Sequence, residues 1–68
     1  MIKYKNVAIC KIKDEHFYVG QVCAITNIKG NIITLNNNIS VGIDDKDFIF
    51  MLNATEAEID LIRNCVTR

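Results

Sequence analysis

The chain of 68 residues lacks most of the features that mark enzymes. It has one histidine and one serine, Ser40, so a nucleophile beside a histidine and an orienting acid has few candidates. Its three glycines stand far apart and form no glycine-rich phosphate loop. A domain of this size also has little room for a deep pocket. These absences predict a protein that is not an enzyme and that has no catalytic residues and no cofactor.

The chain is also poor in cysteine and in long apolar runs. Cys10, Cys23 and Cys65 form no CxxC pair, and a disulfide framework in so short a chain would use more cysteines. We therefore expect reduced, buried thiols in an intracellular protein. The longest apolar run, Phe48–Leu52, is far shorter than the roughly 20 residues of a membrane span. The sequence thus predicts a cytoplasmic protein without a membrane partner or a signal peptide.

A metal site is not expected either. His16 stands between Cys10 and Cys23, and all three residues are of types that bind zinc. Their spacing fits no compact zinc site, and structural zinc prefers four ligands. We interpret His16 as a turn residue.

Half of the residues are hydrophobic, which favours a folded domain over disorder. A single domain of this length buries only roughly 60% of its unfolded surface, so a partner subunit is a common source of further stability. Isoleucine, asparagine and lysine together make up 26 residues, and proline and tryptophan are absent. This bias is typical of AT-rich coding DNA, as in many phages.

Alternating apolar and polar residues predict a mainly β chain. Gly20 falls inside one apolar segment and suggests a bulge, and Lys29–Asn31 reads "KGN", the signal of a tight hairpin turn. The predicted strands span residues 2–12, 17–28, 31–36, 39–43 and 47–52.

The period changes near residue 55. Thr55 and Glu58 form a capping box, and a broad apolar stripe follows, so a helix is predicted over residues 56–66. The predicted stripe consists of Ile59, Leu61, Ile62, Cys65 and Val66. A helix this short is marginal alone, and its stripe must dock on the sheet or on another subunit. We expect one α+β domain: a small five-stranded antiparallel SH3-like barrel or sheet, followed by one C-terminal helix.

The segment "VGIDDKDFIF" places Asp44, Asp45 and Asp47 between two apolar runs. An EF-hand would need coordinating oxygens where Phe48 and Phe50 stand, and a short polar turn offers no burial for a catalytic pair. Two interpretations remain. The aspartates form a strand connection, or they form an acidic patch that meets a basic partner.

The segment from Val19 to Phe48, "VGQVCAITNIKGNIITLNNNISVGIDDKDF", resembles the central strands of the small carbon storage regulators, which are RNA-binding dimers. The likeness consists of hydrophobic alternation around "KGN" and a terminal helix. The chain departs from that family at its Gly-Val-x-Ala-Pro turn, where it has "LNNNI", and at the RNA-contacting arginine, where it has "DDKD". RNA binding is therefore not carried over.

The net charge is zero, but residues 1–43 carry +3 and residues 44–68 carry −3. The leading hypothesis is a small non-enzymatic module that binds a host protein or a second copy of itself, and the composition suits a phage-encoded modulator or inhibitor of a host protein. Its predicted contact residues are Asp44, Asp45, Asp47, Glu56, Asp60 and Arg63. One alternative is a nucleic-acid-binding barrel that uses Lys3, Lys5, Lys11, Lys13, Tyr18 and Lys29. A weaker alternative is an oligomer that sequesters a small anionic ligand.

Overall fold

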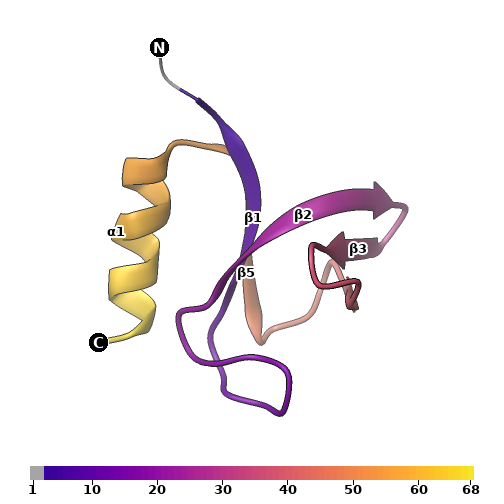
Figure 1. The fold of residues 1–68 in the computed structure, drawn as a ribbon, viewed down its shortest axis with the longest axis horizontal. Coiled ribbons are helices and arrows are strands. Elements are labelled where there is room, and N and C mark those ends of the chain that lie inside the picture. Colours follow the sequence, from indigo (N-terminus) through magenta and orange to yellow (C-terminus); the bar gives the residue numbers. More distant parts are fainter. Residues whose placement is uncertain (1–2) are drawn as a thin grey trace.

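The computed structural model describes residues 3–68. Its elements are β1 (Lys5–Cys10), β2 (Val22–Lys29), β3 (Ile32–Leu35), β4 (Ser40–Gly42), β5 (Phe48–Ala54) and α1 (Glu56–Val66). The strands form an open antiparallel sheet in the order β4-β3-β2-β1-β5, and the helix lies beside it (Figure 1). The prediction of a mainly β chain with five antiparallel strands and one C-terminal helix is confirmed.

Strand β1 carries buried side chains on both of its faces. Ala8 and Cys10 belong to one hydrophobic cluster, while Val7 and Ile9 belong to a second cluster. The first cluster also contains Phe17, which meets Phe48 edge to face with the ring centroids 5.0 Å apart. Because side chains alternate across a strand, β1 separates two cores that lie on opposite sides of the sheet.

Helix α1 covers the second cluster. Ile59 is buried among Val7, Ile9 and Ala54, so the apolar stripe docks on the outer face of β1 and β5. The predicted capping box is present. The Glu58 N–H donates to Thr55 Oγ1 at 3.2 Å, and the Thr55 N–H donates to Glu58 Oε1 at 2.8 Å. The Thr55 hydroxyl also donates to Glu58 Oε1, at 2.9 Å. The bond from the Thr55 N–H and, to a smaller extent, this hydroxyl bond hold the pKa of Glu58 below its usual range.

The β2–β3 hairpin turns at Gly30 and Asn31, as the sequence predicts. Gly30 has φ +60°, whereas Asn31 does not have a positive φ. A positive φ at the first central residue alone is the signature of a type II′ turn, which suits the twist of paired strands.

The second predicted strand begins too early. Residues 17–21 form a loop, and β2 starts only at Val22. Gly20 has φ +85° and donates its N–H to Cys10 O, while the Gln21 N–H donates to Tyr18 O. The apolar character of this segment reflects burial of Phe17 in the core, and Gly20 is a turn residue outside the strand.

The other strand boundaries differ by smaller amounts. Ile2, where the first predicted strand begins, lies outside the described residues, and β1 starts at Lys5. β1 ends at Cys10. One more backbone bond follows, from the Lys11 N–H to Asp47 O, and the chain then leaves the sheet. At the other end of the sheet, β5 extends to Ala54 through a bulge in which Asn53 has φ +54°.

The cysteines divide into two kinds. Cys10 and Cys23 are buried, as expected, and burial is the main cause that raises the pKa of both thiols. Cys65 is exposed, so the expectation of three buried thiols is wrong. Cys65 and Leu61, both predicted in the apolar stripe of the helix, are exposed, so only Ile59, Ile62 and Val66 of that stripe pack on the sheet. No helix within residues 3–68 is long and apolar enough to cross a membrane.

Candidate functional site

A groove of about 290 Å³ lies between α1 and the outer face of the sheet. Its lining residues come from β1, β2, the turn after β3, and α1: Lys5, Val7, Val22, Ala24, Asn36, Glu56, Ile59, Asp60 and Arg63. The groove exists because the helix covers β1 and β5 but stops short of β2. The sheet is therefore wider than the single helix that packs on it.

The floor of the groove is apolar. Val7 pairs with Ala24 and Ile9 pairs with Val22 across the β1–β2 ladder, so these side chains share one face of the sheet. Val7 and Ile9 lie under the helix, whereas Ala24 is exposed and Val22 keeps 36% of its surface accessible. The floor thus presents apolar surface that nothing in residues 3–68 covers.

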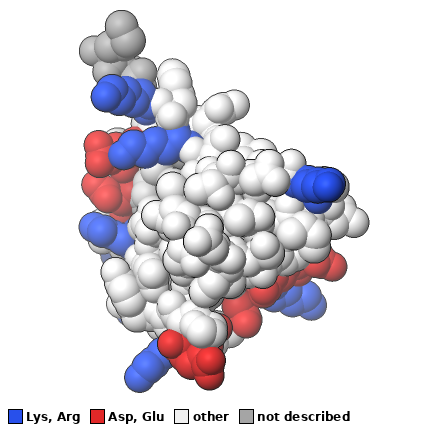
Figure 2. Space-filling model, turned by 45° about the vertical axis from the view of Figure 1, so that its right-hand side comes forward, with Lys and Arg blue, Asp and Glu red and all other residues white. Residues whose placement is uncertain are grey.

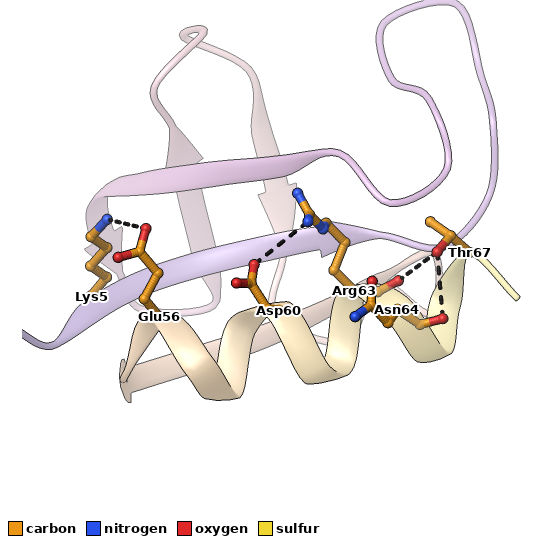
Figure 3. Close-up of polar contacts among 6 residues, drawn as sticks. All are labelled: Lys5, Glu56, Asp60, Arg63, Asn64 and Thr67. Carbon is orange, nitrogen blue, oxygen red and sulfur yellow. Dashed lines mark hydrogen bonds and ion pairs between the residues drawn. The ribbon is translucent and has the colours of Figure 1, made fainter.

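The rim of the groove is charged and neutral in sum. Lys5 Nζ lies 3.8 Å from Glu56 Oε1, and Arg63 lies 3.6 Å from Asp60 Oδ1. Figure 3 shows all four side chains on the side of α1 that faces the strands. Both pairs are about half exposed or more, so each contributes little to stability and its members can turn toward a partner.

The aspartates form a connection stabilised by their own hydrogen bonds. The Asp47 N–H donates to Asp45 Oδ1 at 2.9 Å, and the Asp45 N–H donates to Gly42 O at 3.0 Å. An aspartate that accepts from the backbone two residues later is the Asx turn typical of this residue type. This geometry accounts for Asp45 as a turn residue.

The residues predicted to form one acidic contact surface lie in two places. Asp44, Asp45 and Asp47 precede β5, while Glu56 follows it. Seven strand residues span roughly 20 Å, so the turn and the start of the helix are at opposite ends of β5. Of the predicted contact residues, the structure gathers only Glu56, Asp60 and Arg63 at one site, the groove.

The lysines proposed for nucleic-acid binding are also dispersed. Lys5 lies at one end of β1 beside Glu56, Lys11 and Lys13 follow its other end, and Lys29 stands at the β2–β3 hairpin. Figure 2 shows the basic side chains on the face in view as separate groups around a wide uncharged area. In the sequence, Lys29 is the only charged residue between positions 17 and 43.

Residues 3–68 contain no arrangement of side chains suited to binding a metal ion. No group of three or more His, Cys, Asp or Glu side chains there could hold a metal ion. His16 lies in the loop after β1, where its Nε2 is 3.1 Å from Glu15 Oε1.

Sequence reasoning missed the apolar floor of the groove. Val22 and Ala24 belong to a segment in which apolar and polar residues alternate. Nothing in its sequence tells whether the helix covers the face of the strand that carries these two side chains. Asn36 reaches the same site because its N–H donates to Ala24 O. The signal for this site would have been that a five-stranded sheet is wider than one 11-residue helix can cover, so part of one face stays exposed.

Comparisons of the chain with protein-family models, with curated protein sequences and with solved structures each find no match.

Proposed function

We propose that the chain is a small non-enzymatic module that binds another protein through the groove between β2 and α1. The observation that carries the proposal is the combination of an uncovered apolar floor, Val22 and Ala24, with a charged rim. Protein contact sites commonly have an apolar centre and a polar rim. A role as a phage-encoded modulator of a host protein extends this proposal and is supported by composition.

The rim indicates the chemistry of the partner. Lys5 and Glu56 stand at one end of the groove, and Asp60 and Arg63 stand further along the helix. A partner segment that places an apolar side chain on the floor and carries charges of both signs beside it would fit this surface. The balanced rim does not favour a small anion, and the dispersed lysines do not favour a nucleic acid.

Photo-crosslinking tests the proposal. A photo-reactive residue is placed at Ala24, on the floor, and the chain is irradiated in the cells that naturally express it. We expect a discrete heteromeric product that disappears when Asp60→Lys and Arg63→Glu are added to the same chain. The matched control carries the photo-reactive residue at Ile32, which is 50% exposed on β3.

Two outcomes contradict the proposal. One is the absence of a heteromeric product from position 24. The other is the same product from position 32, which would show contact without a specific site. Co-purified nucleic acid released at high salt would instead favour the lysine-based alternative, since phosphate contacts weaken steeply with salt.

We also propose that the sheet curls into a partly open, SH3-like barrel in which the two edge strands, β4 and β5, do not pair with each other. The support is that β2 serves both halves of the sheet: Val22–Ala24 pair with β1, and Ile25–Lys29 pair with β3. A break in register between Ile25 and Asn27 marks the change of partner. Strands that pass from one sheet to another at a bulge form the corners of orthogonal β packings. An experimental structure with β4 and β5 on a flat, uncurved sheet would contradict this.

A further inference from the structure

The outer edge of β5 is free for pairing. β5 is the last strand of the sheet order and pairs only with β1 among the described strands. The Lys11 N–H donates to Asp47 O, so Lys11 and Asp47 are a hydrogen-bonded pair of the ladder. Hydrogen-bonded pairs alternate along antiparallel strands, which makes Ile9–Ile49 and Val7–Met51 the next ones. The N–H and C=O groups of Phe50 and Leu52 therefore point away from β1.

Apart from the bulge at Asn53, near its end, this edge carries none of the usual protection against pairing. β5 reads FIFMLNA, with seven residues, no charge and no proline. Natural edge strands are commonly shortened, charged or covered. β4, the other edge, has only three residues. The long unprotected edge is thus β5, and its Leu52 side chain is 58% exposed.

Helix α1 provides a second, independent observation at the β5 edge of the sheet. Asp60 and Arg63 lie on the flank of α1 that lines the groove, toward β2. Since β5 lies on the other side of β1, the opposite flank of the helix overhangs the edge of β5. At about 100° per residue from the sheet-facing Ile59, Asp60 lies about 100° round toward the groove, while Cys65 and Leu61 lie about 120° and 160° round the helix in the other direction. Leu61 is 63% exposed, so no contact within residues 3–68 accounts for a large apolar side chain at this position.

We propose that two copies of this chain associate through their β5 edges about a two-fold axis. Antiparallel self-pairing centred on Met51 places Phe50 of one copy opposite Leu52 of the other, short of the bulge at Asn53. Their outward N–H and C=O groups then bond to each other, and Leu52 is buried against Phe50. The uncharged strand is complementary to itself, which a charged strand would not be.

The helices fit this arrangement. β1 and β5 are about 4.8 Å apart and α1 lies over both, so the helix axis is about half a strand spacing inside β5. The two-fold axis lies half a strand spacing outside β5, which puts it roughly 5 Å from the helix axis. The two helices would then be about 10 Å apart, close to the usual helix-packing distance. The helix runs back along the sheet from the end of β5 (Figure 1), which places Leu61 and Ile62 roughly level with Met51. The two copies of Leu61 would meet across the axis.

The first test is the mass of the full chain in solution, measured by sedimentation over a range of protein concentrations. We expect a particle of twice the 7.7 kDa chain mass. Leu52→Lys should halve that mass, because it places a charge on the pairing edge. Ile32→Lys, an exposed apolar residue on β3, is the matched control and should leave the dimer intact. Circular dichroism confirms that both variants fold.

The second test reads the geometry of the dimer. In a Cys65→Ser chain, Leu61→Cys should give a disulfide-linked dimer under mild oxidation by air with a copper catalyst. Asp60→Cys, on the groove flank, should give at least tenfold less. A monomeric parent chain, a dimer that survives Leu52→Lys, or equal crosslinking at both positions overturns the proposal. A ring or larger particle also overturns it, since that would require the β4 edge.

The two proposals stand separately. The groove and the β5 edge lie on opposite flanks of α1, so a monomeric chain would still present the groove, and a dimer without a heteromeric partner would retain its β5 contact.

Discussion

Replacing Gly20 with alanine should disrupt the contact between the loop of residues 17–21 and the C-terminal end of α1. Gly20 is buried, has φ +85°, and donates its N–H to Cys10 O at 2.8 Å. A Cβ atom at this position would collide with Thr67 Cγ2 and come within 3.7 Å of Arg63 Cγ. Gly30 offers a matched control, because it also has a positive φ but has nothing within 4 Å of its would-be Cβ.

The comparison separates backbone strain from steric conflict. A non-glycine residue in the left-handed region costs about 1–2 kcal/mol, and Gly30→Ala should lose roughly that much unfolding free energy. Gly20→Ala should lose about 2–4 kcal/mol, since Thr67 or the last turn of the helix must also move. For a domain of this length the total unfolding free energy is about 3–10 kcal/mol, so the loss is a large fraction of it.

A double-mutant cycle with Thr67→Ala isolates the steric part. We would measure urea unfolding by circular dichroism at one protein concentration, because self-association shifts apparent stability. Thr67→Ala removes the colliding methyl group, so the double variant should recover about 1 kcal/mol relative to the sum of the single effects. Equal costs for Gly20→Ala and Gly30→Ala, or strict additivity with Thr67→Ala, would refute the reasoning.

Three further outcomes are expected. Ile33→Ala, at a side chain that is 1% exposed, should cost about 2–5 kcal/mol in urea unfolding, whereas Ile32→Ala, at 50% exposure, should change stability by less than about 0.5 kcal/mol. Thr55→Ala should cost about 1 kcal/mol by removing the helix cap. The lowered pKa of Glu58 means that its stabilising contribution is present above the carboxyl's ordinary pKa and is lost as pH falls through the lowered value. Thr55→Ala keeps the backbone N–H and removes only the hydroxyl bond to Glu58, so it should make the acid limb of a stability–pH curve slightly less steep. Iodoacetamide should label one thiol, Cys65, in the native chain and all three in urea, because the other two are buried with raised pKa values.

The helix could be predicted to the residue because its signals are local. The capping box of Thr55 and Glu58 lies within four residues, and the apolar stripe follows directly. The start of β2 could not be predicted, because Phe17 is apolar for the same reason that strand residues are: it is buried in the core. Hydrophobicity reports burial, and it reports secondary structure only where its period is long enough to read.

The groove could be predicted only in part. Glu56, Asp60 and Arg63 were recognised as one exposed helix face, and the structure gathers them at the rim. Their apolar neighbours Val22 and Ala24 come from a strand more than 30 residues earlier in the chain. Such a site depends on which strands a helix covers, and that follows from tertiary packing rather than from local pattern.

The central position of β1 has a consequence for how the protein is made. Its residues Val7–Cys10 need partners on both sides of the sheet, and one of those partners, β5, begins only at Phe48. At ordinary synthesis rates of about 5–20 residues per second, β1 is synthesised roughly 2–8 seconds before β5. During that interval a strand that is apolar on both faces has only the β2 hairpin beside it. Folding of the sheet should therefore finish only when β5 and the helix that covers it have been synthesised.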